Sequence, residues 1–130
     1  MSHHRHAVTA PDAPKPAGPY SHAVQSGGLL FCSGQVAIDP ATGRLVEGGP
    51  GDQVSQCLEN LQTVARAGGC ELADAVRMTV YVTDMGAFGE VNEAYGSFFA
   101  ADPPARVTIG VAALPGGADV EVDAVIALPD

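Results

Sequence analysis

The apolar residues of this chain recur with two different periods, and the order of those periods leaves few folds open. Alternation of apolar and polar residues predicts a strand, whereas apolar residues three and four positions apart predict an amphipathic helix. In chain order, the segments are strands over 20–25 and 29–33, a helix over 54–65, a strand over 76–82, a helix over 88–99, and strands over 106–111 and 120–127. The predicted order is therefore ββαβαββ, an α+β domain with a mixed sheet.

Glycines and one acidic residue mark the expected ends of these elements. Gly27-Gly28 is a hairpin turn between the first two strands. Asp52 is the expected N-cap of the first helix, and Gly68-Gly69 is expected to end it. Two helices cover only one face of a sheet, yet the strands carry aliphatic residues on both faces. We therefore expect copies of the chain to associate through the open face and to form clefts between subunits.

The length of 130 residues fits one domain, expected over 18–130. Residues 1–17 show no periodicity and are predicted to be a mobile N-terminal tail. Their HHRH run at 3–6 could bind metal weakly, although a disordered basic end is the favoured interpretation. No apolar run reaches the length of about 18 residues that a membrane span requires, and the N-terminus lacks a signal-peptide pattern. A soluble, cytoplasmic protein is expected.

The charge and the cysteines restrict the classes of partner. Fifteen acidic and six basic side chains give a formal net charge of −9, the wrong sign for binding a phosphate backbone, so no nucleic acid is expected. Cys32, Cys57 and Cys70 have no metal-like spacing and are predicted to be reduced, packed thiols. No phosphate-binding glycine loop, nucleophile elbow or Cys/His cluster is found, so no cofactor and no metal are expected.

Arg106 is the candidate that the charge pattern singles out, because it is the only basic residue from Met78 onward, among eight carboxylates. Arg106 and Thr108 share one face of their strand, and Glu121 faces one side of the next. If these two strands pair as an antiparallel hairpin, all three side chains line one side of it. A guanidinium can hold a carboxylate with two hydrogen bonds, and a glutamate can polarise water. The alternative is a cross-strand salt bridge between Arg106 and Glu121.

Three other polar residues are weaker candidates. Asn92 interrupts the apolar stripe of the second predicted helix, where it would orient either a loop or a substrate. Tyr20 could place its hydroxyl at the rim of a site, although a packed aromatic residue is the commoner outcome. Ser33 precedes Gly34, whose missing side chain permits close backbone approach.

Read in order, seven short motifs resemble those of the YjgF/RidA family of reactive-intermediate deaminases, formerly called endoribonuclease L-PSP. They are Gly18-Pro19-Tyr20, Ser33-Gly34-Gln35, Asn60-Leu61, Val91-Asn92-Glu93-Ala94-Tyr95, Pro104-Ala105-Arg106, Leu114-Pro115 and Val120-Glu121-Val122-Asp123-Ala124. Each is common alone, but their shared order from Gly18 to the end makes the resemblance specific.

The resemblance implies a chorismate-mutase-like fold and a homotrimer whose sheets form a central barrel, with three clefts between subunits. It implies that Arg106 binds a substrate carboxylate, that Glu121 positions the attacking water, and that Tyr20, Ser33 and Asn92 complete the cleft. The backbone of Thr108 would lie beside the reacting nitrogen. Many family members have cysteine at this position, which backbone contacts should tolerate. The connection before Arg106 is short, with Pro103 where an aromatic residue is common, and it should affect substrate preference.

Three functions are compatible with the sequence. The first, which the resemblance favours, is hydrolytic deamination of enamines and imines of the 2-aminoacrylate type to 2-keto acids and ammonia, as in a 2-iminobutanoate/2-iminopropanoate deaminase. The second is a non-catalytic, regulatory trimer that binds a small carboxylate metabolite. The third is an endoribonuclease or translation inhibitor, against which the negative charge counts.

Overall fold

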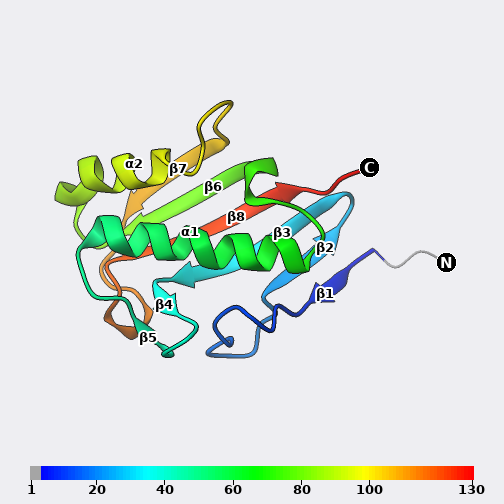
Figure 1. The fold of residues 1–130 in the computed structure, drawn as a ribbon, viewed down its shortest axis with the longest axis horizontal. Helices are drawn as coiled ribbons and strands as arrows, with labels where there is room; N and C mark the ends of the chain where they lie inside the picture. The colour runs from blue at the N-terminus through cyan, green and yellow to red at the C-terminus, as the bar shows by residue number, and fades with distance from the viewer. Residues whose placement is uncertain (1–3) are drawn as a thin grey trace.

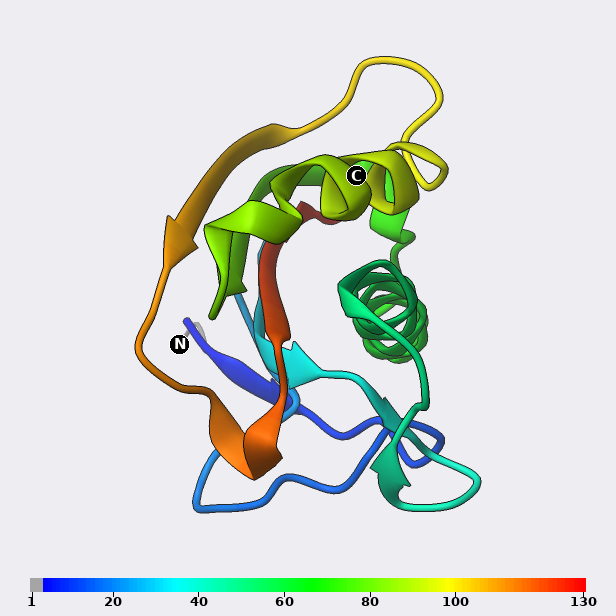
Figure 2. The ribbon, with the colours of Figure 1, turned by 90° about the vertical axis from the view of Figure 1, so that its left-hand side faces the viewer.

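A computed structural model describes residues 4–130 of the chain as one curved sheet with two helices packed on the same side (Figures 1 and 2). In spatial order, the sheet contains β1 (His6–Val8), β2 (Ala23–Ser26), β3 (Leu29–Val36), β8 (Val120–Ala127), β6 (Ala75–Val82) and β7 (Ala105–Gly110). All neighbours are antiparallel except β6 and β7, which are parallel. The predicted α+β class and the mixed sheet with both helices on one face are confirmed.

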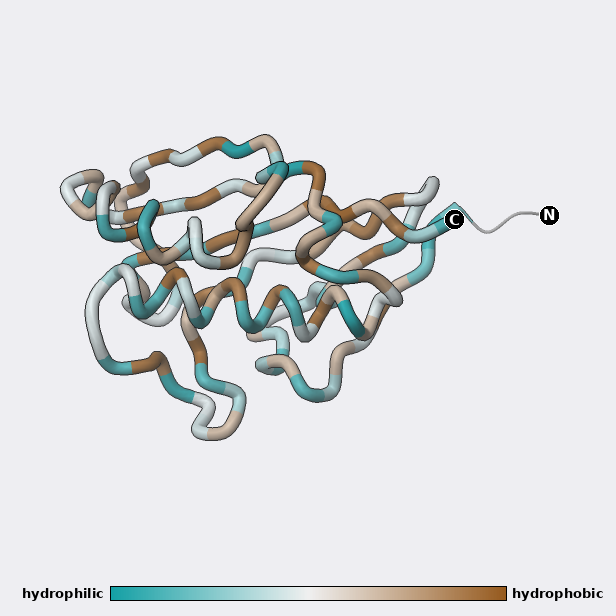
Figure 3. The backbone as a smooth tube through the Cα atoms, turned by 45° about the horizontal axis from the view of Figure 1, so that its top comes forward, coloured by the Kyte–Doolittle hydropathy of each residue, from teal (hydrophilic) through white to brown (hydrophobic). Residues whose placement is uncertain are grey.

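Helix α1 (Pro50–Ala67) covers β3 and β8, and α2 (Phe88–Gly96) lies beside it. Hydrophobic and hydrophilic residues alternate along α1 in Figure 3, as expected for a helix with one buried side. Val54, Leu58 and Leu61 of this helix are fully buried. They pack with the side chains of β8 that face the helices, including Val122 and Ile126, so the core lies between the helices and the sheet.

The observed N-cap of the first helix lies three residues before the predicted one. Gly49 is the N-cap, Pro50 occupies the first turn, and Asp52 is the third residue, whose Oδ2 accepts a hydrogen bond from the Gly49 N–H at 3.0 Å. The prediction of Asp52 as N-cap was wrong because an acidic side chain at this position stabilises the helix start by reaching back. The predicted end is confirmed, with Gly68 as the C-cap and Gly69 at φ +87°.

The N-terminal segment forms a strand and a packed loop in place of the expected tail. Residues 6–8 form β1, which pairs with β2 at the edge of the sheet. Ala10 and Ala13, in the loop that follows, are buried in the core. Short apolar side chains between prolines carry no periodic signal, so only their tertiary contacts reveal this role. Met1–His3 lie outside the described residues, and so does part of the HHRH run.

Smaller elements connect the main ones. They are the two-stranded sheet β4 (Ile38–Asp39) and β5 (Arg44–Leu45), and 3-10 turns at Leu72–Asp74, Met85–Ala87 and Pro115–Gly117. Cys32, Cys57 and Cys70 are buried free thiols, as predicted, and burial raises the pKa of Cys32 to about 12. Among the described residues, no helix combines the length and the apolar character needed to cross a bilayer.

Candidate functional site

Arg106 is held in place by neutral groups of helix α2. Its Nη2 donates a hydrogen bond to Oδ1 of Asn92 at 2.5 Å. Its guanidinium carbon lies 4.7 Å from the centre of the Tyr95 ring and 5.7 Å from that of Phe88, within the range of cation–π contacts. No carboxylate in residues 4–130 forms an ion pair with it. The cation is therefore oriented, but its charge is left available for an anion.

Two hydroxyl groups in the same region have no partner. Thr108 follows Arg106 by two residues on β7, so both side chains point to the helix side of the sheet. Within the described chain, Oγ1 of Thr108 and Oη of Tyr95 are buried and make no hydrogen bond. Buried polar atoms are rarely left unpaired in native proteins. This part of the molecule therefore has hydrogen-bonding capacity for a ligand or another subunit.

Glu121 lies in a separate pocket of about 110 Å³ at the end of the sheet. Tyr20 and His22 line this pocket together with Gly34 of β3 and the loop residues 14–17. A Cβ atom added at Gly34 would collide with the Glu121 carboxylate, so the missing side chain creates the space that this carboxylate occupies. A close backbone approach is predicted at Gly34, but the group that fills this space is the side chain of Glu121.

The environment of Glu121 raises its pKa above the ordinary value, mainly through burial and then through the negative charge of Asp123. Asp123 lies two residues along β8 and faces the same side of the sheet. Its Oδ2 accepts a hydrogen bond of 2.7 Å from the hydroxyl of Tyr81. Tyr81 is directly opposite Glu121 on β6, yet it donates to Asp123. Glu121 is thus a carboxylate that binds a proton more readily than usual.

The strand pairing separates Arg106 from Glu121 within one chain. Arg106 lies opposite Met78 of β6, whose side chain faces the helices, whereas Glu121 lies opposite Tyr81, which faces the other side. The antiparallel pairing of these two strands, on which the expected grouping of Arg106, Thr108 and Glu121 depends, does not occur because β6 lies between β7 and β8. The alternative of an Arg106–Glu121 salt bridge is excluded for the same reason.

Tyr20 and Ser33 lie near Glu121. Tyr20 is 48% exposed, and its hydroxyl accepts a hydrogen bond from the Ala17 N–H at 3.0 Å, so it lies at the pocket rim. Oγ of Ser33 donates to the carbonyl oxygen of Ser21 at 2.7 Å and so fixes the loop that carries Tyr20. The candidates therefore form two groups, Arg106, Thr108 and Asn92 on one side, and Glu121, Tyr20 and Ser33 on the other.

Several residues that support these groups have no clear signal in the sequence. Gln53 of α1 is buried, and its Oε1 accepts hydrogen bonds from the backbone N–H groups of Asp119 and Val120 at 2.8 and 3.3 Å. It thereby fixes the start of the strand that carries Glu121. Tyr81 donates a hydrogen bond to Asp123, but in the sequence it is only one of the alternating residues of the predicted strand over 76–82. Long-range hydrogen bonds of this kind leave no local pattern.

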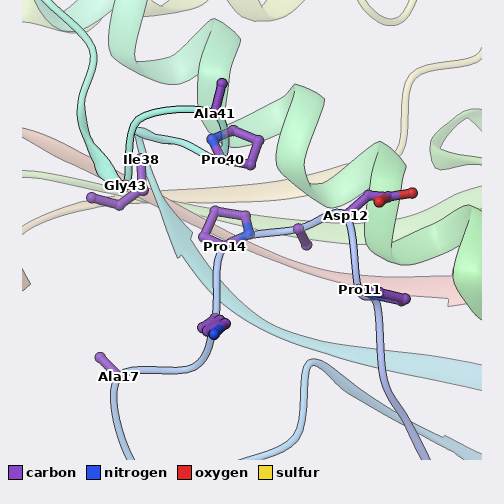
Figure 4. A pocket seen from close by; sticks show the side chains of 10 residues that line it. Pro11, Asp12, Pro14, Ala17, Ile38, Pro40, Ala41 and Gly43 are labelled. Atoms are coloured by element: carbon purple, nitrogen blue, oxygen red, sulfur yellow. The ribbon is translucent and has the colours of Figure 1, made fainter.

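A larger groove of about 720 Å³ adjoins the Glu121 pocket (Figure 4). One wall is the loop that carries Pro11, Asp12 and Pro14, and the other contains Pro40 and Ala41 of the turn between β4 and β5. The groove and the pocket share residues 14, 15, 17 and 38. The loop over residues 10–17 therefore forms a wall common to both.

The same fold and motifs occur in known proteins. The family model described as "Endoribonuclease L-PSP" matches residues 10–128. A RutC family protein, y4sK of Sinorhizobium fredii, is 49% identical over 121 residues, covering 93% of this chain and 96% of its own. The 2-iminobutanoate/2-iminopropanoate deaminase of Mus musculus is 43% identical, covering 93% and 90%.

A solved structure extends the comparison to a bound amino acid. The crystal structure of E. coli TdcF with bound serine matches with a TM-score of 0.89 and 32% identity, covering 95% of this chain and 99% of that one. The family match spans most of the domain and includes every candidate site residue named above. The chain therefore belongs to the Endoribonuclease L-PSP family, the YjgF/RidA family that its motifs predict.

Proposed function

We propose that this protein hydrolyses small imines derived from amino acids, with 2-iminopropanoate, the tautomer of 2-aminoacrylate, as the type substrate. The observation that carries the proposal is the state of Arg106, a guanidinium oriented by Asn92 and two aromatic rings, with no carboxylate partner in the described chain. Such a group can bind a planar carboxylate through two hydrogen bonds. The deaminase relatives at about 40% identity support the reaction type.

Glu121 is the group that we assign to proton transfer. In its ionised form it accepts a proton from a water molecule, whose oxygen attacks the carbon of the C=N bond. The resulting tetrahedral adduct carries one hydroxyl and one amino group on that carbon. Glu121, which has passed the water proton to the nitrogen to form this amino group, then moves the hydroxyl proton to the same nitrogen, so that ammonia leaves as the C=O bond forms, the 2-keto acid is released and Glu121 is ionised again. A carboxyl group with a raised pKa is suited to both steps.

A complete site requires more than one copy of the chain, because Arg106 and Glu121 face opposite sides of the sheet. The face away from the helices carries exposed apolar side chains on two strands, Phe31 of β3 and Val107 and Ile109 of β7. We propose that these faces pack together in a homotrimer, so that Arg106 of one subunit and Glu121 of its neighbour meet in a cleft. Burying that apolar surface would stabilise the assembly.

The rate at which the protein hydrolyses a freshly generated imine tests the proposal. A serine dehydratase produces 2-aminoacrylate in the cuvette, and the decay of the imine absorbance to pyruvate is followed with the protein added. We expect faster decay that is lost in Arg106→Ala and Glu121→Gln. The exposed residues Arg44 and Glu59 provide matched controls, Arg44→Ala and Glu59→Gln, which should behave as the unchanged protein.

Two other outcomes would replace the proposal. Saturable binding of 2-ketobutyrate that requires Arg106, without any acceleration of imine decay, would identify a carboxylate-binding protein. Cleavage of RNA that is lost in Arg106→Ala would indicate a nuclease. The net charge of −9 is unfavourable for a polyanionic substrate, so we expect no cleavage.

A further inference from the structure

His22 is a buried histidine whose two ring nitrogens both hydrogen-bond to the backbone of one loop. Its Nδ1 accepts from the N–H of Ala10 at 3.0 Å, and its Nε2 lies 2.8 Å from the carbonyl oxygen of Pro14. A backbone N–H can only donate and a carbonyl can only accept, so Nδ1 carries no proton and Nε2 does. The contacts therefore require the neutral Nε2–H form of the imidazole, which is only 6% exposed.

The loop that His22 holds makes few other hydrogen bonds, although its Ala10 and Ala13 side chains are buried in the core. Residues 9–22 form no helix or strand. Ala13 donates a backbone hydrogen bond to Ala10, and Ala17 donates to the hydroxyl of Tyr20, so these bonds remain local. The imidazole ties residues 10 and 14 to the start of β2, and residues 14–17 line the pocket that contains Glu121. Two hydrogen bonds of one side chain thus link a wall of the candidate site to the start of β2.

We propose that His22 is a positioning residue whose neutral Nε2–H form holds residues 10–17 as the wall of the Glu121 pocket, and whose protonation releases that wall and weakens substrate binding. A proton added at Nδ1 removes the acceptor of the Ala10 N–H and turns two donors toward each other. It also places a charge in a buried site, where an unpaired donor and a charge are both unfavourable. The last step, weaker substrate binding, rests on the proposed function.

The surroundings of His22 carry both signs of charge. Asp12 and Lys15 lie on the loop itself, and Glu121 of β8 lines the same pocket as His22. Tyr20 is the remaining titratable group in the pocket lining, and β3 contributes only uncharged residues there. None of these side chains hydrogen-bonds to the imidazole, whose two partners are the backbone groups of Ala10 and Pro14.

The first test reads the loop without any substrate. Nitrogen-15 NMR of the full-length protein should show the Nε2–H tautomer of His22 near neutral pH. The hydrogen-exchange protection factor of the Ala10 amide should fall about tenfold or more as His22 becomes protonated, because its acceptor is lost. An Nδ1–H tautomer, or protection of Ala10 that is independent of His22 protonation, would overturn the proposal.

Two substitutions of His22 separate the effect of losing its hydrogen bonds from the effect of protonating its ring. Glutamine offers a hydrogen-bond acceptor and a donor but has no ionisable group, whereas leucine offers neither an acceptor nor a donor. In His22→Leu we expect Ala10 protection to be lost and KM for the imine to rise about tenfold, with a smaller change in kcat. His22→Gln should restore the protection of the Ala10 amide and the KM of the unchanged protein. In this variant, acidification should no longer lower the protection of Ala10. His4→Gln, which changes an exposed histidine, is the matched control.

The outcomes distinguish this proposal from the function on which it partly rests. If imine hydrolysis is absent but Ala10 protection follows His22 protonation, the positioning role stands and the proposed reaction falls. If hydrolysis is present and His22→Gln still loses Ala10 protection on acidification, the positioning role is wrong. A failure of His22→Leu to fold leaves the comparison of His22→Gln with the unchanged protein decisive.

Discussion

Arg106 and Glu121 project from opposite faces of the sheet, and strand β6 lies between the strands that carry them. One chain therefore does not present both groups to one small substrate. In the proposed reaction each face would carry half of the chemistry, with Arg106 on the helix side binding the carboxylate and Glu121, in the pocket lined by residues 14–17, accepting the proton. We therefore expect the proposed activity to come from sites shared between copies of the chain.

Mixed assemblies test this sharing directly. Arg106→Ala and Glu121→Ala should each be inactive alone, but co-refolding equal amounts should restore about one quarter of the unchanged activity. In a trimer with random mixing, about three quarters of the assemblies contain both variants, and each of these has one complete site of three. Imine decay rates measure the recovered activity, and native mass spectrometry measures the fraction of assemblies that contain both variants. No recovery in confirmed mixed trimers would mean that both residues act within one subunit, or that the assignment is wrong.

Removing the amide that orients Arg106 should weaken substrate binding. In Asn92→Ala the guanidinium loses its 2.5 Å hydrogen bond but keeps its ring contacts. A hydrogen bond to a charged group contributes about 1.5–3 kcal/mol, so we expect KM to rise roughly tenfold to hundredfold. Steady-state kinetics gives the value. Glu93→Ala, an exposed neighbour on α2, should leave KM unchanged. An unaltered KM in Asn92→Ala would show that the rings alone orient Arg106.

The charge of Asp123 should shift the pH range of activity. Glu121 must be ionised to accept a proton from water, so activity is lost as pH falls through its pKa. Burial and Asp123 both raise that pKa, which moves the loss to higher pH than for an ordinary carboxyl. Asp123→Asn removes the second cause but keeps an acceptor for Tyr81, so the acid limb of kcat/KM should move to lower pH. Carboxyl carbon-13 NMR of Glu121 should show the same direction.

A matched charge change provides the control for this shift. Asp130→Asn removes one negative charge from an exposed position at the end of the chain and should leave the acid limb in place. If both variants move it equally, the effect comes from net charge rather than from the neighbour of Glu121. If neither variant moves the acid limb of kcat/KM, a group other than Glu121 controls that limb.

Gly34 should tolerate no side chain, because its missing Cβ makes room for the Glu121 carboxylate. In Gly34→Ala the carboxylate must turn away, and misplacing a reacting group by about 1 Å can lower activity roughly hundredfold. The fold should persist, since the displaced atoms end a side chain. Gly89→Ala is the control, because a Cβ there meets nothing within 4 Å. Full activity in Gly34→Ala would show that Glu121 does not have the role in proton transfer that we propose.

Local patterns along the chain predict most elements of secondary structure, and the seven motifs predict the family. Alternation over residues 76–82 and helical spacing over 54–65 are local patterns, and both elements form where the patterns predict them. The second helix ends at Gly96 rather than at Phe99, although Phe99 is still buried against Tyr95, with ring centres 4.9 Å apart. Apolar spacing reports which side chains are buried, but it does not report whether the backbone remains helical.

The grouping of the candidate residues follows from how the strands are arranged in three dimensions. Periodicity assigns Arg106 and Glu121 to a face of their own strands, but it does not specify which strand lies beside which. The connection from α2 returns the chain parallel to β6 and places β7 at the sheet edge, so β7 does not pair with the next strand, β8. The role of residues 10–17 was hidden for the same physical reason. It depends on hydrogen bonds to His22, twelve and eight residues away in the chain, which no local pattern encodes.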